Sequence, residues 1–418
     1  MSIREEIIKQ AEKSKIAAGQ MANISTEKKN SALYKIAAGL LERSEEILEA
    51  NKKDMEKAKN KNLSKAFLDR LSLDENRIKG IAEGLKEVAE LADPIGDILE
   101  MNRRPNGLQI GKMRVPLGVI GIIYEARPNV TVDAAALCIK SGNSVILRGG
   151  SSAINSNKKL AEIISENIKK AGLPAKAVQL IQTTDRKAVK ELLTLNEYLD
   201  LLIPRGGAEL INRVVNESKI PVIQTGVGNC HIFVDESADL QMAAKITENA
   251  KTSRPAVCNA AESLLIHENI AEDFIPKIVK VLSKHQVEIR GDKTAVNIDD
   301  SIKDAEESDW DKEYLDYIIS FKVVDDLEEA INHINKYGTR HSEAIITEHY
   351  TNSQRFLNEV DAAAVYVNAS TRFTDGNMFG LGAEIGISTQ KMHARGPMGL
   401  KELTSTKYVV YGQGQRRE

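Results

Sequence analysis

The hydrophobic and polar positions of the chain follow two different periods. In the first quarter, apolar side chains recur at helical spacing among Ala, Lys and Glu, as in residues 34–41. After Gly107 the pattern changes to short apolar runs rich in β-branched residues, which are typical of buried strands. These runs lie at residues 119–124, 144–147, 178–181 and 199–203. The pattern predicts a helical start followed by a strand-rich region.

Helical patterns separate the predicted strands. Residues 157–171 are rich in Ala and Lys, and Gly172 and Pro174 follow them, a combination that ends a helix. Strands that alternate with helices imply parallel βαβ units and a doubly wound sheet. A second alternating section follows Cys258. It includes residues 316–324, 342–347 and 362–367. We therefore predict an α/β protein with two doubly wound domains.

Composition and charge narrow the classes of function. A chain of 418 residues, 42% of them hydrophobic, exceeds the usual size of one domain and can bury large cores. Its 57 basic and 60 acidic residues give a net charge of -3, which provides no general attraction to nucleic acid or anionic membrane. No run approaches the roughly 18 apolar residues of a membrane span, and the start is charged. We predict neither export nor membrane insertion.

The three cysteines, Cys138, Cys230 and Cys258, are too few and too scattered for a disulfide framework or a zinc cluster. This usage predicts a reducing, cytoplasmic location and no metal site. Cys258 stands among small residues directly before the apolar run 264–266, and Arg254 lies close by. A sulfur nucleophile needs small neighbours and nearby cations or amides. From the local sequence alone, a buried structural cysteine is the slightly favoured alternative.

Two glycine-rich turns are candidate cofactor-binding sites, although the G-x-G-x-x-G fingerprint is absent. Gly206 and Gly207 follow a predicted strand and open a helix, whose amides and positive dipole end suit a pyrophosphate. Arg148 ends another predicted strand, directly before Gly149 and Gly150. Ligands of open α/β sheets bind at this end of a strand, so Arg148 is a candidate to bind a phosphate or a ribose. Each turn by itself is equally well explained as an ordinary strand-to-helix turn.

Four motifs carry a family resemblance that covers nearly the whole chain. They are PLGVIG at residues 116–121, YEARPNVT at 124–131, IPRGG at 203–207 and FGLGAEIGISTQ at 379–390. The chain resembles the aldehyde dehydrogenase superfamily, and within it the γ-glutamyl phosphate reductase family. The resemblance implies an aldehyde dehydrogenase-like fold, with two Rossmann-type α/β domains and a small β oligomerisation flap. A homo-oligomer is therefore expected.

The resemblance also implies how the chain is divided. A cofactor-binding domain would comprise residues 1–99 and 117–225. The catalytic domain, with the nucleophilic cysteine, would comprise residues 226–398. The flap would be formed by the distant segments 100–116 and 399–418.

The activity implied by the resemblance is the NADPH-dependent reduction of L-glutamyl 5-phosphate to L-glutamate 5-semialdehyde and phosphate, the second step of proline biosynthesis. Cys258 falls at the family's nucleophile position and would form a thioester. Cys138 and Cys230 do not share that position, and Cys138 is interpreted as core packing. The resemblance makes Asn129 the expected donor to the oxyanion, together with the Cys258 amide, and Arg127 a competing candidate.

One departure from the superfamily bears on the mechanism. Hydrolytic members place a glutamate as general base at the head of a glycine-rich segment, whereas this chain has Gln224 there. An amide cannot take up a proton near neutral pH, so water attack on a thioester should be slow. The sequence therefore favours acyl-phosphate reduction over hydrolysis. Alternatively, Gln224 only packs a turn and another carboxylate supplies the base.

The remaining expectations concern ligands and partners. Ser151 or Ser152 stands where NAD-selecting members place a glutamate, which together with Arg148 favours NADP(H). Glu313 resembles the glutamate that holds the nicotinamide ribose. The substrate's anionic groups need cations, for which the candidates are Arg127, Arg254, Arg372 and Arg395, each open to the alternative of a surface salt bridge. Glutamate 5-kinase is a candidate partner because the acyl phosphate is labile.

Two other functions stay open at this point. One is a phosphate-independent aldehyde oxidoreductase, which would turn over without phosphate in the oxidative direction. The other is a non-catalytic nucleotide-binding scaffold of the same fold, which would show no turnover at all.

Overall fold

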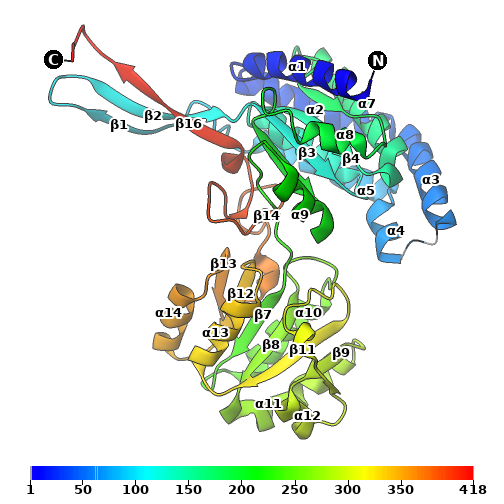
Figure 1. The fold of residues 1–418 in the computed structure, drawn as a ribbon, viewed down its shortest axis with the longest axis vertical. Helices are drawn as coiled ribbons and strands as arrows, with labels where there is room; N and C mark the ends of the chain where they lie inside the picture. The colour runs from blue at the N-terminus through cyan, green and yellow to red at the C-terminus, as the bar shows by residue number, and fades with distance from the viewer. Residues whose placement is uncertain (1, 62, 64, 418) are drawn as a thin grey trace. The chain divides into compact units, whose positions relative to one another are not determined.

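The computed structural model describes residues 2–61, 63 and 65–417. The chain divides into two compact units (Figure 1). Unit 1 comprises Met1–Gln224, Gly380–Gly386 and Met398–Glu418, and unit 2 comprises Thr225–Phe379 and Ile387–Pro397.

Unit 1 begins with helices, as the sequence predicts. They are α1 (Ile3–Met21), α2 (Thr26–Glu42), α3 (Ser44–Asn60), α4 (Lys65–Leu71) and α5 (Glu75–Glu90). Ser2 and Glu5 form a capping box at the start of α1, and Asp74 accepts a hydrogen bond from the Arg77 amide at the start of α5. Among the described helices, none combines the length and apolar character that crossing a bilayer requires.

A parallel sheet of order β5-β4-β3-β6 forms the centre of unit 1. Its strands are β3 (Val119–Tyr124), β4 (Ser144–Gly149), β5 (Val178–Leu180) and β6 (Leu201–Arg205). The connecting helices are α6 (Asn129–Lys140), α7 (Ile154–Lys170), α8 (Lys187–Leu192) and α9 (Ala208–Glu217). Because the chain runs outward from β3 to β5 and then returns to β6 on the other side of β3, the strand order reverses between β3 and β6. Ligands of open α/β sheets bind at the carboxyl ends of the strands at such a point.

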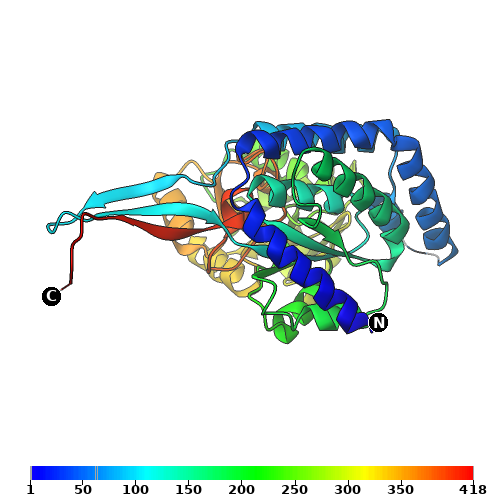
Figure 2. The same ribbon diagram turned by 90° about the horizontal axis from the view of Figure 1, so that it is seen from above.

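A separate antiparallel sheet of unit 1 joins segments that are distant in the sequence. It contains β1 (Ile98–Arg103), β2 (Gln109–Pro116) and β16 (Thr404–Tyr411), with β2 in the middle. Figures 1 and 2 show these three strands side by side, extending as an arm away from the parallel sheet of the same unit. Apolar side chains on β16 are exposed, and Tyr408 is 70% exposed. The small antiparallel sheet confirms this part of the predicted fold.

Unit 2 contains a seven-stranded sheet of order β10-β9-β11-β8-β7-β12-β13, in which every neighbouring pair is parallel. The strands are β7 (Cys230–Val234), β8 (Ala261–His267), β9 (Glu288–Gly291), β10 (Lys303–Asp304), β11 (Ile318–Val324), β12 (Ser342–Ile346) and β13 (Ala364–Val367). A small antiparallel pair, β14 (Ile387–Ser388) and β15 (Gly396–Pro397), belongs to the same unit. The two parallel sheets, together with the three-stranded antiparallel sheet of unit 1, confirm the predicted fold class.

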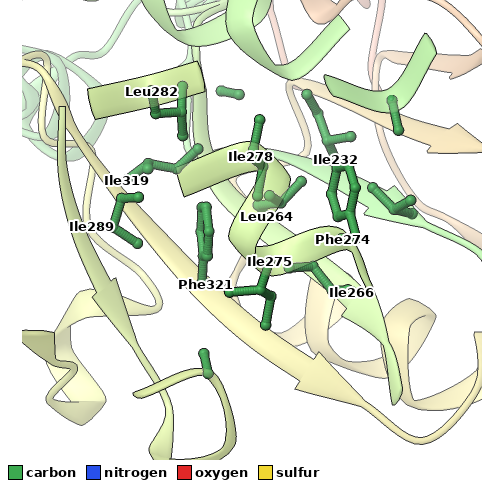
Figure 3. Packing of buried hydrophobic residues seen from close by; sticks show 14 of the residues in the cluster. Ile232, Leu264, Ile266, Phe274, Ile275, Ile278, Leu282, Ile289, Ile319 and Phe321 are labelled. Atoms are coloured by element: carbon green, nitrogen blue, oxygen red, sulfur yellow. The ribbon is translucent and has the colours of Figure 1, made fainter. Parts of the chain in front are cut away.

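Helices cover both faces of this sheet, and the strand residues alternate between two cores. On one face Leu264, Ile266 and Phe321 pack against Phe274 and Ile278 (Figure 3). These helical residues come from α11 (Glu268–Ser283), which lies with α10 (Leu240–Thr252) and α12 (Lys293–Ile298). Leu265 points to the opposite face, toward helices α13 (Leu327–Tyr337) and α14 (Tyr350–Glu359). Alternation follows from the two-residue period of a strand.

Candidate active site

Cys258 lies in a turn between α10 and β8, and its side chain is half-buried. The Ala260 amide donates to the Val257 carbonyl oxygen at 3.1 Å, which closes the turn directly before β8 begins at Ala261. Gly228 likewise lies before the amino end of β7, and Glu313 lies before the amino end of β11. Because these strands are parallel, their amino ends meet at one edge of the sheet. The candidate site of unit 2 therefore lies at the amino edge of its sheet.

Gly228 lies directly against the backbone of Cys258. A Cβ built on Gly228 would lie 1.5 Å from the Cys258 carbonyl oxygen and 2.7 Å from its Cα. Gly228 also donates its amide to Oε1 of Glu313 at 2.7 Å. The absence of a side chain at residue 228 thus lets three loops meet, and it couples the predicted ribose ligand Glu313 to the turn that carries Cys258.

Asn259 fixes the other side of the same turn. Its Nδ2 donates to the carbonyl oxygens of Thr374 at 2.9 Å and Arg372 at 3.2 Å. Its own carbonyl accepts from Oγ1 of Thr371 at 2.8 Å, and its Oδ1 accepts from Arg372. The turn around Cys258 is therefore held to the segment that carries Arg372.

Two arginines that the sequence singles out as anion ligands lie near Cys258. Nε of Arg372 donates to Oγ of Ser253 at 3.1 Å, in the same loop as Arg254. Burial lowers the pKa of Arg372, the charge of Arg254 lowers it further, and Cys258 acts in the opposite direction. Two guanidinium groups at this position favour an anion, whether a thiolate or a ligand phosphate.

Arg395 has a different environment. It donates to Asp361 at 2.6 Å, and the same carboxylate also binds Lys391 at 2.7 Å. Its side chain is therefore part of a surface ion-pair cluster in unit 2. An additional role in substrate binding stays a prediction.

In unit 1 the predicted cofactor residues follow the carboxyl ends of the strands. Gly207 caps α9, and its amide donates to Oε2 of Glu125, which follows β3, at 3.0 Å. A Cβ on Gly206 would lie 2.4 Å from the same carboxylate oxygen. The Glu125 carboxylate already accepts the hydrogen bond of the Gly207 amide at the start of α9, so a phosphate that binds here would have to displace it. The turn lies at the reversal point between β3 and β6, where open α/β sheets bind ligands, and its role in binding a dinucleotide phosphate stays a prediction.

Arg148 lies near the carboxyl end of β4, and Ser151 follows that strand. Arg148 is only 8% exposed, and its guanidinium donates to the carbonyl oxygens of Gly149 at 3.0 Å and Thr184 at 3.3 Å. Burial lowers the pKa of Arg148. Ser151 is exposed and begins the short 3-10 helix η1 (Ser151–Ala153). Arg148 thus connects the end of β4 to the segment after β5, and contact with a cofactor phosphate stays a prediction.

Asn129 is the first residue of α6, and its Nδ2 donates to Oδ2 of Asp133 at 2.9 Å. Burial raises the pKa of Asp133 to about 6, and the hydrogen bond from Asn129 opposes that shift. A side-chain amide carries two N–H bonds, so one remains for a ligand in this arrangement. Ala126, between β3 and the half-buried Arg127, has a φ of 33°, a conformation that L residues rarely adopt and that is often found at functional sites.

Comparison with known proteins identifies the family. The model of the "Aldehyde dehydrogenase family" matches residues 2–307. The chain belongs to the aldehyde dehydrogenase family.

A "Gamma-glutamyl phosphate reductase" of Halothermothrix orenii is 64% identical over 418 residues, and the alignment covers 100% of both chains. A relative of the same name from Clostridium novyi is 62% identical over 417 residues, again covering 100% of both. The crystal structure of "Gamma-glutamyl phosphate reductase" from Thermotoga maritima superposes with a TM-score of 0.97 at 52% identity, covering 99% of this chain and 100% of that one.

These matches confirm the resemblance carried by the four motifs. Enzymes of the aldehyde dehydrogenase family are oxidoreductases that use a nicotinamide cofactor. Among the described residues, no group of three or more His, Cys, Asp or Glu side chains is arranged to hold a metal ion.

A buried ion pair, which no sequence pattern indicated, lies beside the candidate site. Lys251 at the end of α10 and Glu262 in β8 are both 0% exposed, and their charged atoms are 2.5 Å apart. Burial raises the pKa of Glu262 to about 7 and lowers that of Lys251. Oε1 of Glu262 also accepts from the Leu315 amide at 3.1 Å. The pair therefore supports the segment that carries Glu313.

Replacing Lys251 with methionine should lower the free energy of unfolding by about 3 to 5 kcal/mol, because Glu262 would then be buried without its cation. Urea denaturation of unit 2, followed through Trp310 fluorescence, measures the change. The matched control is Arg355→Met in α14 of the same unit, since Arg355 and Glu359 are 41% and 43% exposed and such pairs contribute less than about 1 kcal/mol. Equal, small losses in both variants would contradict a stabilising role for the buried pair.

Proposed function

We propose that the chain catalyses the NADPH-dependent reduction of L-glutamyl 5-phosphate to L-glutamate 5-semialdehyde and phosphate. The observation that carries this proposal is the 64% identity, over all 418 residues, to a relative named for this activity. The geometry of unit 2 supports it, because a half-buried cysteine lies in a turn held by Gly228 and Asn259 with two arginines nearby.

Cys258 is the proposed nucleophile. Its thiolate attacks the γ-carbonyl carbon and a C–S bond forms. The bond between this carbon and the phosphate oxygen breaks, and the departing phosphate takes up a proton from solvent to leave as the dianion. This leaving group needs little protonation, so a general acid is dispensable. The cations of Arg254 and Arg372 would bind the anionic groups of the substrate. Asn129, or Arg127 in its place, and the Cys258 amide would stabilise the oxyanion.

Reduced nicotinamide supplies the hydride when it is bound. For the cofactor, unit 1 offers the glycine turn at Gly206 and Gly207 and the exposed Ser151, and unit 2 offers Glu313. An uncharged serine does not repel a 2′-phosphate as a carboxylate would, which supports NADPH over NADH. After reduction of the thioester, the hemithioacetal collapses, releasing the aldehyde and the Cys258 thiolate.

Gln224 supports reduction rather than hydrolysis. Its amide cannot activate a water molecule as a base, so the thioester persists long enough to be reduced. The alternative, a turn-packing role for Gln224 with another carboxylate as base, predicts measurable hydrolysis of the acyl enzyme.

The same proposal assigns a role to each domain of the chain. Residues 1–99 and 117–225 would bind the cofactor, residues 226–398 would carry the chemistry, and residues 100–116 and 399–418 would mediate homo-oligomerisation. The exposed apolar side chains of β16 support this last assignment. Association with glutamate 5-kinase and a cytoplasmic location remain predictions.

The proposal is tested in the oxidative direction, with glutamate 5-semialdehyde, NADP and phosphate. We expect formation of NADPH that depends on phosphate and is faster than formation of NADH from NAD. Absorbance of the reduced nicotinamide measures both rates. Turnover that needs no phosphate would favour a phosphate-independent aldehyde oxidoreductase, and no turnover with either cofactor would favour a non-catalytic scaffold.

A further inference from the structure

A second cysteine contacts the residue that carries the proposed nucleophile. Cys230 is the first residue of β7 and is fully buried. Its thiol donates a hydrogen bond to the carbonyl oxygen of Cys258, with the sulfur 3.1 Å from that oxygen. Nδ1 of His341 lies 3.7 Å from the same sulfur. Cys230 thus lies beneath the turn of Cys258, within unit 2.

The local strand pairing explains why these two residues meet. Cys230 pairs with Ala261, but the next residue, His231, pairs with Ser263, so Glu262 is an extra residue in β8. Such an irregularity bends a strand and redirects its side chains. In β8 the side chain of Glu262 pairs with Lys251. In the turn before β8, the Cys258 carbonyl lies next to the Cys230 thiol.

Cys230 remains a hydrogen-bond donor because it remains protonated. Burial raises its pKa well above the usual value, and the negative charge of Glu343 acts in the same direction. A neutral thiol also places no second negative charge beside a Cys258 thiolate. The chemistry of this site therefore suits a structural S–H group and does not suit a second nucleophile.

We propose that Cys230 is a positioning residue: its thiol holds the Cys258 carbonyl and so fixes the direction in which the Cys258 side chain points. This inference rests on the proposed role of Cys258 as nucleophile. The peptide unit between residues 258 and 259 is fixed from two sides. The Cys230 thiol binds the Cys258 carbonyl oxygen, and the side chain of Asn259 donates to the Thr374 carbonyl oxygen. Reacting atoms must be placed to well within about 1 Å, so losing one of these restraints slows the chemical step.

The test compares Cys230→Ala, which removes the donor, with Cys230→Ser, which keeps one. We expect kcat to fall about 3- to 10-fold in Cys230→Ala with little change in the KM for substrate, and Cys230→Ser to recover most of the loss. The matched control is Cys138→Ala, because Cys138 is equally buried but lies in α6 of unit 1. It should leave kcat within about twofold of wild type.

A second readout requires no substrate. The rate at which iodoacetamide alkylates Cys258, located by mass spectrometry, should change in Cys230→Ala and return toward wild type in Cys230→Ser. Wild-type kcat and alkylation rate in Cys230→Ala, or the same loss in both variants, would overturn the proposal. Failure of wild-type Cys258 to become acylated would instead overturn the proposed function, so the two failures are distinguishable.

Discussion

Cys258→Ser should lower kcat by about 10⁴-fold or more, the largest effect that we expect from a single substitution. A hydroxyl is a far weaker nucleophile than a thiolate, and two arginines near residue 258 do not supply the base that a serine would need. Steady-state rates with glutamate 5-semialdehyde, phosphate and NADP measure the change. The substitution preserves size, so thermal unfolding should stay close to wild type.

The control for this variant is Cys138→Ser. Cys138 is fully buried in α6, and burial raises the pKa of its thiol, so it is an unreactive cysteine of the core. We expect this control to be somewhat less stable and to keep its kcat. Substantial turnover by Cys258→Ser would show that the chemistry does not pass through Cys258.

Gly228→Ala should reduce kcat by about 100-fold or more without touching a reactive atom. The new Cβ would lie 1.5 Å from the Cys258 carbonyl oxygen, and this neighbour is backbone, so the turn itself must move. The same displacement of the turn would strain the hydrogen bond from the amide of residue 228 to Glu313. Both kcat and the KM for the cofactor should therefore change, as steady-state kinetics can measure.

The matched control is Gly80→Ala on the surface of α5, where no atom lies within 4 Å of the new Cβ. Alanine at a helical position should raise stability by about 0.5 to 1 kcal/mol and leave activity unchanged. If Gly228→Ala kept its activity within a few-fold of wild type, the position of Cys258 would tolerate displacement, and the close approach of Gly228 would have no role in catalysis.

Much of the fold was predictable because apolar runs and helix signals are local. The runs at 119–124, 144–147 and 178–181 correspond to β3, β4 and β5, and those at 316–324 and 342–347 contain β11 and β12. The two-residue strand β10 and the four-residue strand β9 were not predicted. Unlike the short strand β5, neither lies in an apolar run, since β9 reads EIRG and β10 reads KD.

The candidate site was predicted in part. The sequence singled out Cys258, Arg254 and Arg372, and the structure brings them together in unit 2. It did not reveal that this group lies at the amino edge of the sheet, since the usual expectation for an open α/β sheet is the carboxyl edge. Which edge carries the reactive turn depends on the tertiary arrangement of the strands.

Contacts between distant segments account for what the sequence could not provide. Nothing local indicated that Gly228 lies against the Cys258 carbonyl. Likewise, no pattern linked Lys251 to Glu262 or Cys230 to the Cys258 turn. Such pairings appear only once the strands are in register.

Covalent catalysis by Cys258 can be tested by mixing the enzyme with L-glutamyl 5-phosphate in the absence of reduced cofactor and locating the acyl group by mass spectrometry. We expect a glutamyl thioester on Cys258 that persists until NADPH is added, with stoichiometric release of phosphate. An adduct on another residue, or phosphate release with no adduct on Cys258, would contradict the proposed mechanism.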